Sequence, residues 1–218
     1  MKTMEWRSLD KSTWGRGPWQ QEPDKKQWVD AATGLPCLIV RNHGGALCGY
    51  VGVPPGHPWH GKAYSGPCLK AEPCTETYCG HSPEGLIAVH GGLTFSDDCE
   101  DLSEAAWERL REREPAWRKE AAQYPVGDAA KRLREWGAAL TSYEVWTEQM
   151  RARAICHLPE PGEPDHVWWF GFDCAHSGDV SPGYDGYLRD HGTYKPIGYV
   201  ERECARLAEQ LAAEKVQA

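Results

Sequence analysis

The segment from Val167 to Asp179, VWWFGFDCAHSGD, passes from an apolar run into a group of titratable side chains. Asp173, His176 and Asp179 follow one another at its end, where a buried strand would give way to an exposed turn. A carboxylate beside an imidazole fixes the tautomer of the ring and raises its basicity. The pattern predicts His176 as a general base oriented by Asp179, with Asp173 and His90 as further catalytic candidates.

Other imidazoles also fall at expected turns and strand ends, and we expect these loops to converge on one pocket. Indole rings there could stack on a base, and an arginine could meet a phosphate. In an enzyme, His57, His60 and His90 would polarise the bond to be broken or hold a metal. The alternative interpretation is that each histidine only makes local hydrogen bonds. The predicted ligand-binding residues are His43, His57, His60, Trp59, Trp168, Trp169, Arg41 and Arg16.

Cysteine spacing suggests one further site. The stretch CLKAEPCTETYCGH brings Cys68, Cys74, Cys79 and His81 close together in the sequence. Thiolate and imidazole are the ligands of tetrahedral zinc, so zinc is the one cofactor the sequence suggests. The stretch lacks the paired C-x-x-C of common zinc sites, so the zinc signal is weak, and the alternative is a loop with small, partly buried thiols.

Composition limits the class of protein. The 218 residues are 40% hydrophobic and 26% charged, which predicts a folded globular chain. The net charge of −8 argues against general binding to duplex DNA. No apolar stretch resembles a signal peptide or a membrane span, so we expect a cytoplasmic protein with reduced thiols. The phosphate-binding glycine motifs and the G-x-S-x-G motif are missing from the sequence.

The elements that must position these residues can be read from local patterns. A turn from Asp30 to Gly34 and another around Asn42–Gly45 predict two consecutive hairpins, with Leu47, Gly49, Val51 and Val53 on one face. Leu86–Phe95 reads as a strand that is bulged or broken at its glycine pair. The run VWWFGFDCA is apolar on both alternating faces, which predicts a central strand covered on both sides.

Helical periodicity occupies the middle and the end of the chain. Asp101 with Glu104 forms a predicted capping box for a first helix, and Asp128 would cap a second. We take 102–153 as a helical-hairpin insertion, whose apolar stripe serves its own core or a partner. A final helix carries Val200, Cys204, Leu207 and Leu211 at helical spacing. The predicted fold is a single α+β domain over 1–218, a mainly antiparallel sheet with this insertion and a C-terminal helix packed on the sheet.

Four segments carry a resemblance that does not come from spacing: GLPCLIVRNHGGALCGYVGVPPGHPWHGK, VHGGLTF, ICHLPEPGEPDHVWWFGFDCAHSGD and YVERECARLAEQLA. They resemble a family of accessory proteins of tailed bacteriophages and prophages, for which no activity is established. The resemblance implies a viral protein acting inside a bacterial cell. Phage accessory proteins often counter bacterial defences, some by binding or cleaving nucleotide signals and others by blocking a defence enzyme.

Two functions follow as expectations. The first is a counter-defence protein that binds a small anionic, nucleotide-like ligand in a Trp-, His- and Gly-lined pocket and, if it is an enzyme, hydrolyses it. The second is a protein-interaction module that inhibits a host defence protein through the helical insertion, with the Cys and His groups structural.

Overall fold

The computed structural model describes residues 1–66, 82–121, 142–184 and 192–214. It comprises two compact units, Met1–Cys99 with Ile155–Ala218 and, between them in the sequence, Glu100–Ala154. The predicted insertion, 102–153, falls within the second unit. Among the described residues, no helix is both long enough and apolar enough to cross a membrane.

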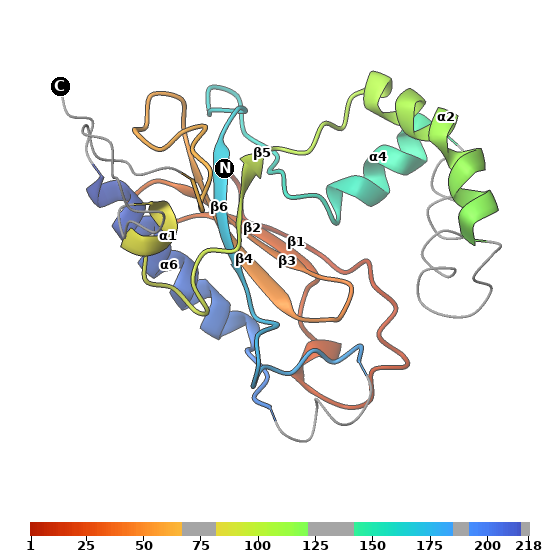
Figure 1. Ribbon diagram of the computed structural model, residues 1–218, viewed down its shortest axis with the longest axis horizontal. Helices are drawn as coiled ribbons and strands as arrows, with labels where there is room; N and C mark the ends of the chain where they lie inside the picture. Colours follow the sequence, from red (N-terminus) through yellow and green to blue (C-terminus); the bar gives the residue numbers. More distant parts are fainter. Residues whose placement is uncertain (67–81, 122–141, 185–191, 215–218) are drawn as a thin grey trace. The chain divides into compact units, whose positions relative to one another are not determined.

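The first unit is built on one antiparallel sheet with the strand order β1-β2-β3-β4-β6-β5 (Figure 1). Helix α6 lies along one face of the sheet and packs on β3 and β4, which confirms the predicted α+β fold with a C-terminal helix on the sheet. The strands are β1 (Met4–Trp6), β2 (Lys25–Val29), β3 (Pro36–Arg41), β4 (Leu47–Val53), β5 (Phe95–Asp98) and β6 (Trp168–Asp173). The helices of this unit are η1 (Pro18–Gln20), α1 (Pro83–Leu86) and α6 (Ile197–Ala213).

Both predicted hairpins are confirmed, and their turns use the expected chemistry. Asp30 accepts hydrogen bonds from the backbone and hydroxyl of Thr33, and Gly34 closes the β2–β3 turn at φ +75°. In the β3–β4 turn the side chain of Asn42 accepts the Ala46 N–H at 3.0 Å. Asx and glycine residues favour these turns because they bond locally or adopt positive φ without strain.

Strand β6 is the central strand that its sequence predicts, because both of its faces are buried. Phe170 and Phe172 join the core under α6, whose Val200, Cys204, Leu207 and Leu211 are fully buried. Val167 and Trp169 belong to a second apolar cluster with Leu38 and Tyr50 on the opposite face. A close approach explains one glycine of β4, since a Cβ at Gly49 would lie 2.5 Å from the Phe172 ring.

The prediction of a strand over Leu86–Phe95 is wrong. Only Phe95 belongs to a strand, and the preceding residues form an irregular segment after α1. Gln210 of α6 bonds both the N–H and the C=O of Ala88, at 2.8 and 3.1 Å. The glycine pair then turns the chain at positive φ. Side chains of a helix therefore satisfy backbone groups that a strand neighbour would otherwise pair.

In the second unit, α2 (Glu104–Ala121) and α4 (Tyr143–Arg151) are described. Ser103, rather than the predicted Asp101, caps α2, because its hydroxyl accepts the Ala106 N–H at 3.2 Å. Asp101 instead accepts the Ser103 N–H. The predicted second cap, Asp128, lies outside the described residues. The core of this unit contains Ala106, Trp107 and Trp146, with Leu102, Leu110, Tyr143 and Met150 packed around it.

A buried ionic network joins the N-terminal arm to the sheet. Arg41 Nε lies 3.1 Å from Asp24 Oδ1, and its Nη2 lies 3.1 Å from Glu22 Oε2. Lys11 Nζ lies 2.6 Å from the same Asp24 oxygen, and the Tyr194 hydroxyl donates to Glu22. Glu22 also accepts the backbone N–H at the start of α6, at 2.9 Å. Two carboxylates thus fix three segments of the chain around one guanidinium.

Substitution Arg41→Met should lower the free energy of unfolding by about 3–5 kcal/mol, because it leaves two buried carboxylates undercompensated. Urea denaturation measures the change. The matched control is Arg7→Met, which removes an exposed arginine 3.2 Å from Glu5 and should change stability by less than about 1 kcal/mol. Equal effects of the two substitutions would contradict a structural role for the network.

Candidate functional site

Three of the four predicted catalytic side chains meet at one carboxylate oxygen. His90 Nε2 lies 2.8 Å from Asp179 Oδ2, and His176 Nδ1 lies 3.7 Å from the same oxygen. One ligand atom from each of the three residues lies within 4.8 Å of the others. His90 is far from the other two in the sequence, so the fold alone creates this group.

The turn after β6 positions His176 and Asp179. The Asp179 N–H donates to the His176 carbonyl at 2.9 Å, and Asp179 Oδ2 accepts the His176 N–H at 3.1 Å. Gly178, at φ +90°, allows the chain to close this turn. A bridge between Asp179 and Thr193 then ties the turn to the segment that leads into α6. The Asp179 backbone is therefore held on both sides, one backbone N–H reaches its carboxylate, and the residue is 8% exposed.

Helix α6 positions His90. The His90 N–H donates to Glu203 Oε2 at 2.9 Å, and the ring Nδ1 lies 3.0 Å from the Tyr199 hydroxyl. Burial, and then the nearby Glu203 carboxylate, raise the pKa of Tyr199, so this partner remains a neutral phenol. Both ring nitrogens of His90 are therefore engaged, one by Tyr199 and one by Asp179. This finding changes the predicted roles, because Asp179 bonds the ring of His90 and only lies near that of His176.

His176 is the unusual member of the group. Its Nδ1 is buried and has no hydrogen-bond partner among the described residues, although the ring as a whole is partly exposed. Asp173 Oδ1 lies 3.7 Å from this nitrogen, as does Asp179 Oδ2. A buried polar atom without a partner calls for an explanation, and an ion or a water molecule is the ordinary one. Two carboxylates directed at one such nitrogen favour a cation.

A lysine side chain also lies at the site and forms an ion pair with Asp179. Lys195 Nζ lies 3.4 Å from Asp179 Oδ1 and 5.6 Å from the centre of the Tyr199 ring. Neither Lys195 nor Tyr199 is among the site residues predicted from the sequence. In the stretch GTYKPIGY, Lys195 directly precedes α6 and Tyr199 lies in its first turn. The sequence could not reveal their role, because the start of α6 lies beside the end of β6 only in the folded chain.

The histidines of the Pro-rich loop do not join this group. His57 Nε2 lies 2.9 Å from the carbonyl of Leu211, near the C-terminal end of α6, whereas His90 contacts Tyr199 in the first turn. These two helix positions are about 18 Å apart along the axis. His60 lies beside Trp168, with ring centroids 6.3 Å apart. The prediction of a single pocket for all of these imidazoles is therefore wrong, because His57 and His90 lie at opposite ends of α6 and His60 lies beside Trp168.

Most of the residues predicted to stack on a base or bind phosphate are packed in the interior of the protein. Trp59 and Trp169 are 3% and 0% exposed within the two apolar clusters, which leaves no ring face for a base. Arg41 lies in the buried ionic network. Trp168 is partly exposed and donates its indole N–H to the Lys62 carbonyl at 2.8 Å. Two residues remain on the surface, Arg16 before η1 and His43 in the β3–β4 turn.

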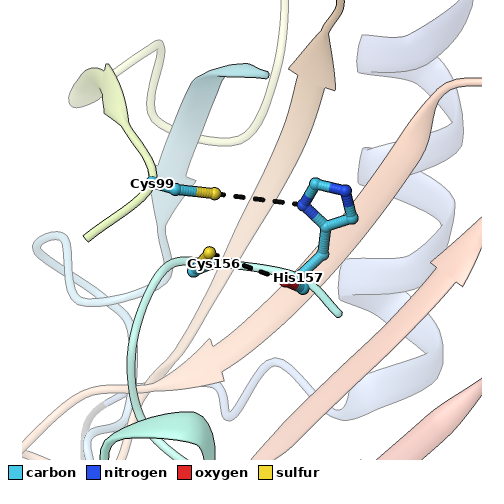
Figure 2. A group of neighbouring side chains, drawn as sticks. All are labelled: Cys99, Cys156 and His157. Carbon is cyan, nitrogen blue, oxygen red and sulfur yellow. Dashed lines mark hydrogen bonds between the residues drawn. The ribbon is translucent and has the colours of Figure 1, made fainter. Parts of the chain in front are cut away.

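A second group of titratable side chains lies on the opposite side of the sheet. Figure 2 shows Cys99, Cys156 and His157 turned toward one another, with one ligand atom from each within 4.8 Å. Hydrogen bonding to Cys156 is the main cause that lowers the pKa of Cys99 to about 4, with smaller contributions from His157 and Trp169, while burial opposes the shift. Sequence reasoning missed this group and predicted zinc at Cys68, Cys74, Cys79 and His81, which lie outside the described residues.

No known family model, curated protein or solved structure significantly matches this chain. Functional inference therefore depends on the geometry of these side chains. Two imidazoles and a carboxylate around one point can hold a divalent metal, or they can transfer protons. The unpartnered nitrogen of His176 favours the metal.

Two adjacent glycines allow a matched test of this geometry. A Cβ at Gly91 would lie 2.1 Å from His176 Cε1, whereas a Cβ at Gly92 would have nothing within 4 Å. Both residues have positive φ, so both alanine substitutions carry backbone strain. Gly91→Ala should therefore destabilise the protein by about 1–3 kcal/mol more than Gly92→Ala, through overpacking against the ring.

Urea denaturation of the two variants measures this difference, and histidine NMR signals show whether the His176 ring has moved. We expect displaced His176 signals in Gly91→Ala alone. Equal stabilities together with unchanged ring signals would contradict the close packing of His176 on Gly91.

Proposed function

We propose that this protein is a metal-assisted hydrolase of small anionic phosphoesters, and that His90, His176 and Asp179 hold the metal. The observation that carries the proposal is the buried, unpartnered Nδ1 of His176, which faces the Asp179 oxygen already bound by His90. A proton alone could satisfy one such contact. A divalent cation satisfies all three ligands at once.

The distances are close to those of a coordinated metal. At the usual bond lengths of zinc to imidazole nitrogen and carboxylate oxygen, a tetrahedral site separates these atoms by about 3.4 Å. The two observed nitrogen–oxygen distances, 2.8 and 3.7 Å, lie on either side of that value. Small rotations of two imidazoles would therefore complete the site without a change of backbone.

Outer partners support the same interpretation. A metal-binding histidine usually donates its second ring N–H to an acceptor, which fixes the ring orientation. The Tyr199 hydroxyl, 3.0 Å from His90 Nδ1, can accept that proton. The Asp179 carboxylate is held by Lys195 at Oδ1 and by the His176 backbone N–H at Oδ2. Each of the two ligands thus has a second contact that orients it.

Three protein ligands leave coordination positions for water and substrate, which is the arrangement of catalytic rather than structural metal sites. A metal held there would polarise a phosphoryl oxygen and lower the pKa of a bound water. Asp173, partly exposed and 3.7 Å from His176 Nδ1, would take a proton from the water that attacks phosphorus, while the bond from phosphorus to the leaving oxygen breaks. Lys195 offers a positive charge to an anionic substrate at the rim.

A nucleotide-like substrate is the finer part of the proposal. It rests on the anion preference of a site with a metal and a lysine, and on the resemblance to phage accessory proteins. In such a protein the hydrolysis of a bacterial nucleotide signal would serve counter-defence. The helical unit offers less support for the alternative of host-protein inhibition, because its described aromatic side chains, Trp107, Tyr143 and Trp146, pack on one another.

Activity can be tested with bis(p-nitrophenyl) phosphate, p-nitrophenyl phosphate and a panel of linear and cyclic nucleotides. Mn²⁺ is the metal to add, because it prefers carboxylate and imidazole ligands to thiolates. Asp179→Asn and His176→Ala should each lower kcat/KM by more than about 100-fold, and Tyr199→Phe by about 10- to 100-fold. Mn²⁺ affinity measured by calorimetry should fall with them.

The matched control is His166→Ala, because His166 is an exposed histidine 3.6 Å from Asp165 that precedes β6, whereas His176 and Asp179 follow the opposite end of that strand. It should leave both activity and Mn²⁺ binding unchanged. Hydrolysis that survives chelation, or that persists in Asp179→Asn, would contradict the metal-assisted mechanism. Mn²⁺ binding without hydrolysis of any substrate would contradict the hydrolase and leave only a metal-binding site.

A further inference from the structure

We propose that Cys99, Cys156 and His157 form a zinc site that fastens together the two chain segments flanking the helical unit. The site is separate from the proposed catalytic group. Cys99 directly precedes the helical unit Glu100–Ala154, and the other two ligands follow its end. All three ligands belong to the sheet unit, so a metal there would clamp the outgoing and returning chain onto the sheet.

The tautomer of His157 is the first argument. Its Nε2 lies 2.9 Å from the Pro164 carbonyl, which can only accept a hydrogen bond. Nε2 therefore carries the proton, and in the neutral ring Nδ1 presents a lone pair. That lone pair faces Cys99 Sγ at 3.9 Å (Figure 2). A histidine fixed by a backbone carbonyl on its far nitrogen is the usual form of a zinc ligand.

The sulfur geometry is the second argument. A tetrahedral zinc ion with ordinary bond lengths separates a ligand sulfur from a ligand nitrogen by about 3.6 Å. The observed 3.9 Å is close to this value, and all three ligand atoms lie within 4.8 Å of one another. Two soft thiolates with one imidazole select zinc over the harder divalent cations. Solvent would occupy the fourth position.

The surroundings of the group are rigid and supply a further contact to sulfur. The indole N–H of Trp169, a fully buried residue of β6, donates to Cys99 Sγ at 3.3 Å. The His157 ring packs edge-on against the same indole, with centroids 5.4 Å apart. Donors to a ligating sulfur and packing around an imidazole tune and orient a metal site.

Buried polar side chains of β2 fix the returning segment. Lys25 Nζ donates to the Cys156 carbonyl at 2.8 Å. Gln27 bonds Leu158 twice, donating to its carbonyl at 3.2 Å and accepting its N–H at 3.0 Å. Both side chains are almost completely buried. These bonds hold Cys156 and His157 at the sheet before any metal binds. The conformational-entropy cost of ordering the ligands on metal binding is therefore smaller.

The test is titration of the reduced full-length protein with Co²⁺ and Zn²⁺. Cobalt bound by thiolates gives an intense sulfur-to-metal charge-transfer absorption, which His and Asp ligands cannot give. We expect this absorption in the wild type, displaced by Zn²⁺. It should disappear in Cys99→Ser/Cys156→Ser, and the Zn²⁺ affinity of Cys156→Ser should fall at least 100-fold.

Three controls make the assignment specific. Cys37→Ala removes a buried thiol from the opposite apolar cluster and should keep the absorption. Cys68→Ser/Cys74→Ser/Cys79→Ser and His90→Ala/His176→Ala should keep it too, which separates this site from the other predicted zinc ligands and from the catalytic proposal. Circular dichroism of each variant confirms that it is folded.

Wild-type protein provides an outcome that does not depend on a folded variant. No cobalt–thiolate absorption in the reduced wild type would overturn the proposal. So would an absorption that needs Cys68, Cys74 and Cys79, or that survives the loss of Cys99 and Cys156. A Cys99–Cys156 disulfide found by mass spectrometry, with no zinc bound after reduction, would assign the pair to redox chemistry instead.

Discussion

Burial of β6 on both faces is the constraint on which the rest of the structure depends. One face packs Phe170 and Phe172 under α6, and the other packs Trp169 against the segments that flank the helical unit. The strand ends at Asp173, and the polar residues that follow it lie beyond the end of the strand, beside the start of α6. The same packing brings the Trp169 indole to Cys99. One buried strand thus organises both groups of candidate metal-binding side chains.

The charged residues divide between stability and chemistry. Arg41, Glu22 and Asp24 satisfy one another in the interior, so the predicted phosphate-binding role of Arg41 has no support in its contacts. The group around Asp179 differs because its bonds remain incomplete at His176. A buried polar atom without a partner calls for an explanation, and at His176 the proposed metal supplies one.

Local chemistry made much of the fold predictable. Asp30 with Gly34 and Asn42 with Gly45 specify their turns through neighbouring residues alone, and the spacing of Val200, Cys204, Leu207 and Leu211 indicates which face of α6 is buried. Prediction failed where the partner is distant in the sequence. Leu86–Phe95 alternates like a strand, yet Gln210 and Glu203 of α6 supply its hydrogen bonds. The sequence indicates which residues lie in turns and at strand ends, but not which of these segments lie side by side in the fold. The prediction therefore places His57 and Arg41 in the same pocket as His176. The sequence predicts His90 and Asp179 in one candidate site, and the structure brings the two side chains into contact, a pairing that the sequence does not indicate.

The central claim is that a divalent metal belongs between His90, His176 and Asp179. Anomalous diffraction from crystals of the full-length protein grown with Mn²⁺ or Zn²⁺ tests it directly. The account predicts an anomalous peak about 2.0–2.2 Å from a nitrogen of each imidazole and from Asp179 Oδ2. With metal present in the crystal, an unchanged 2.8 Å His90–Asp179 hydrogen bond and no peak beside it would contradict the account.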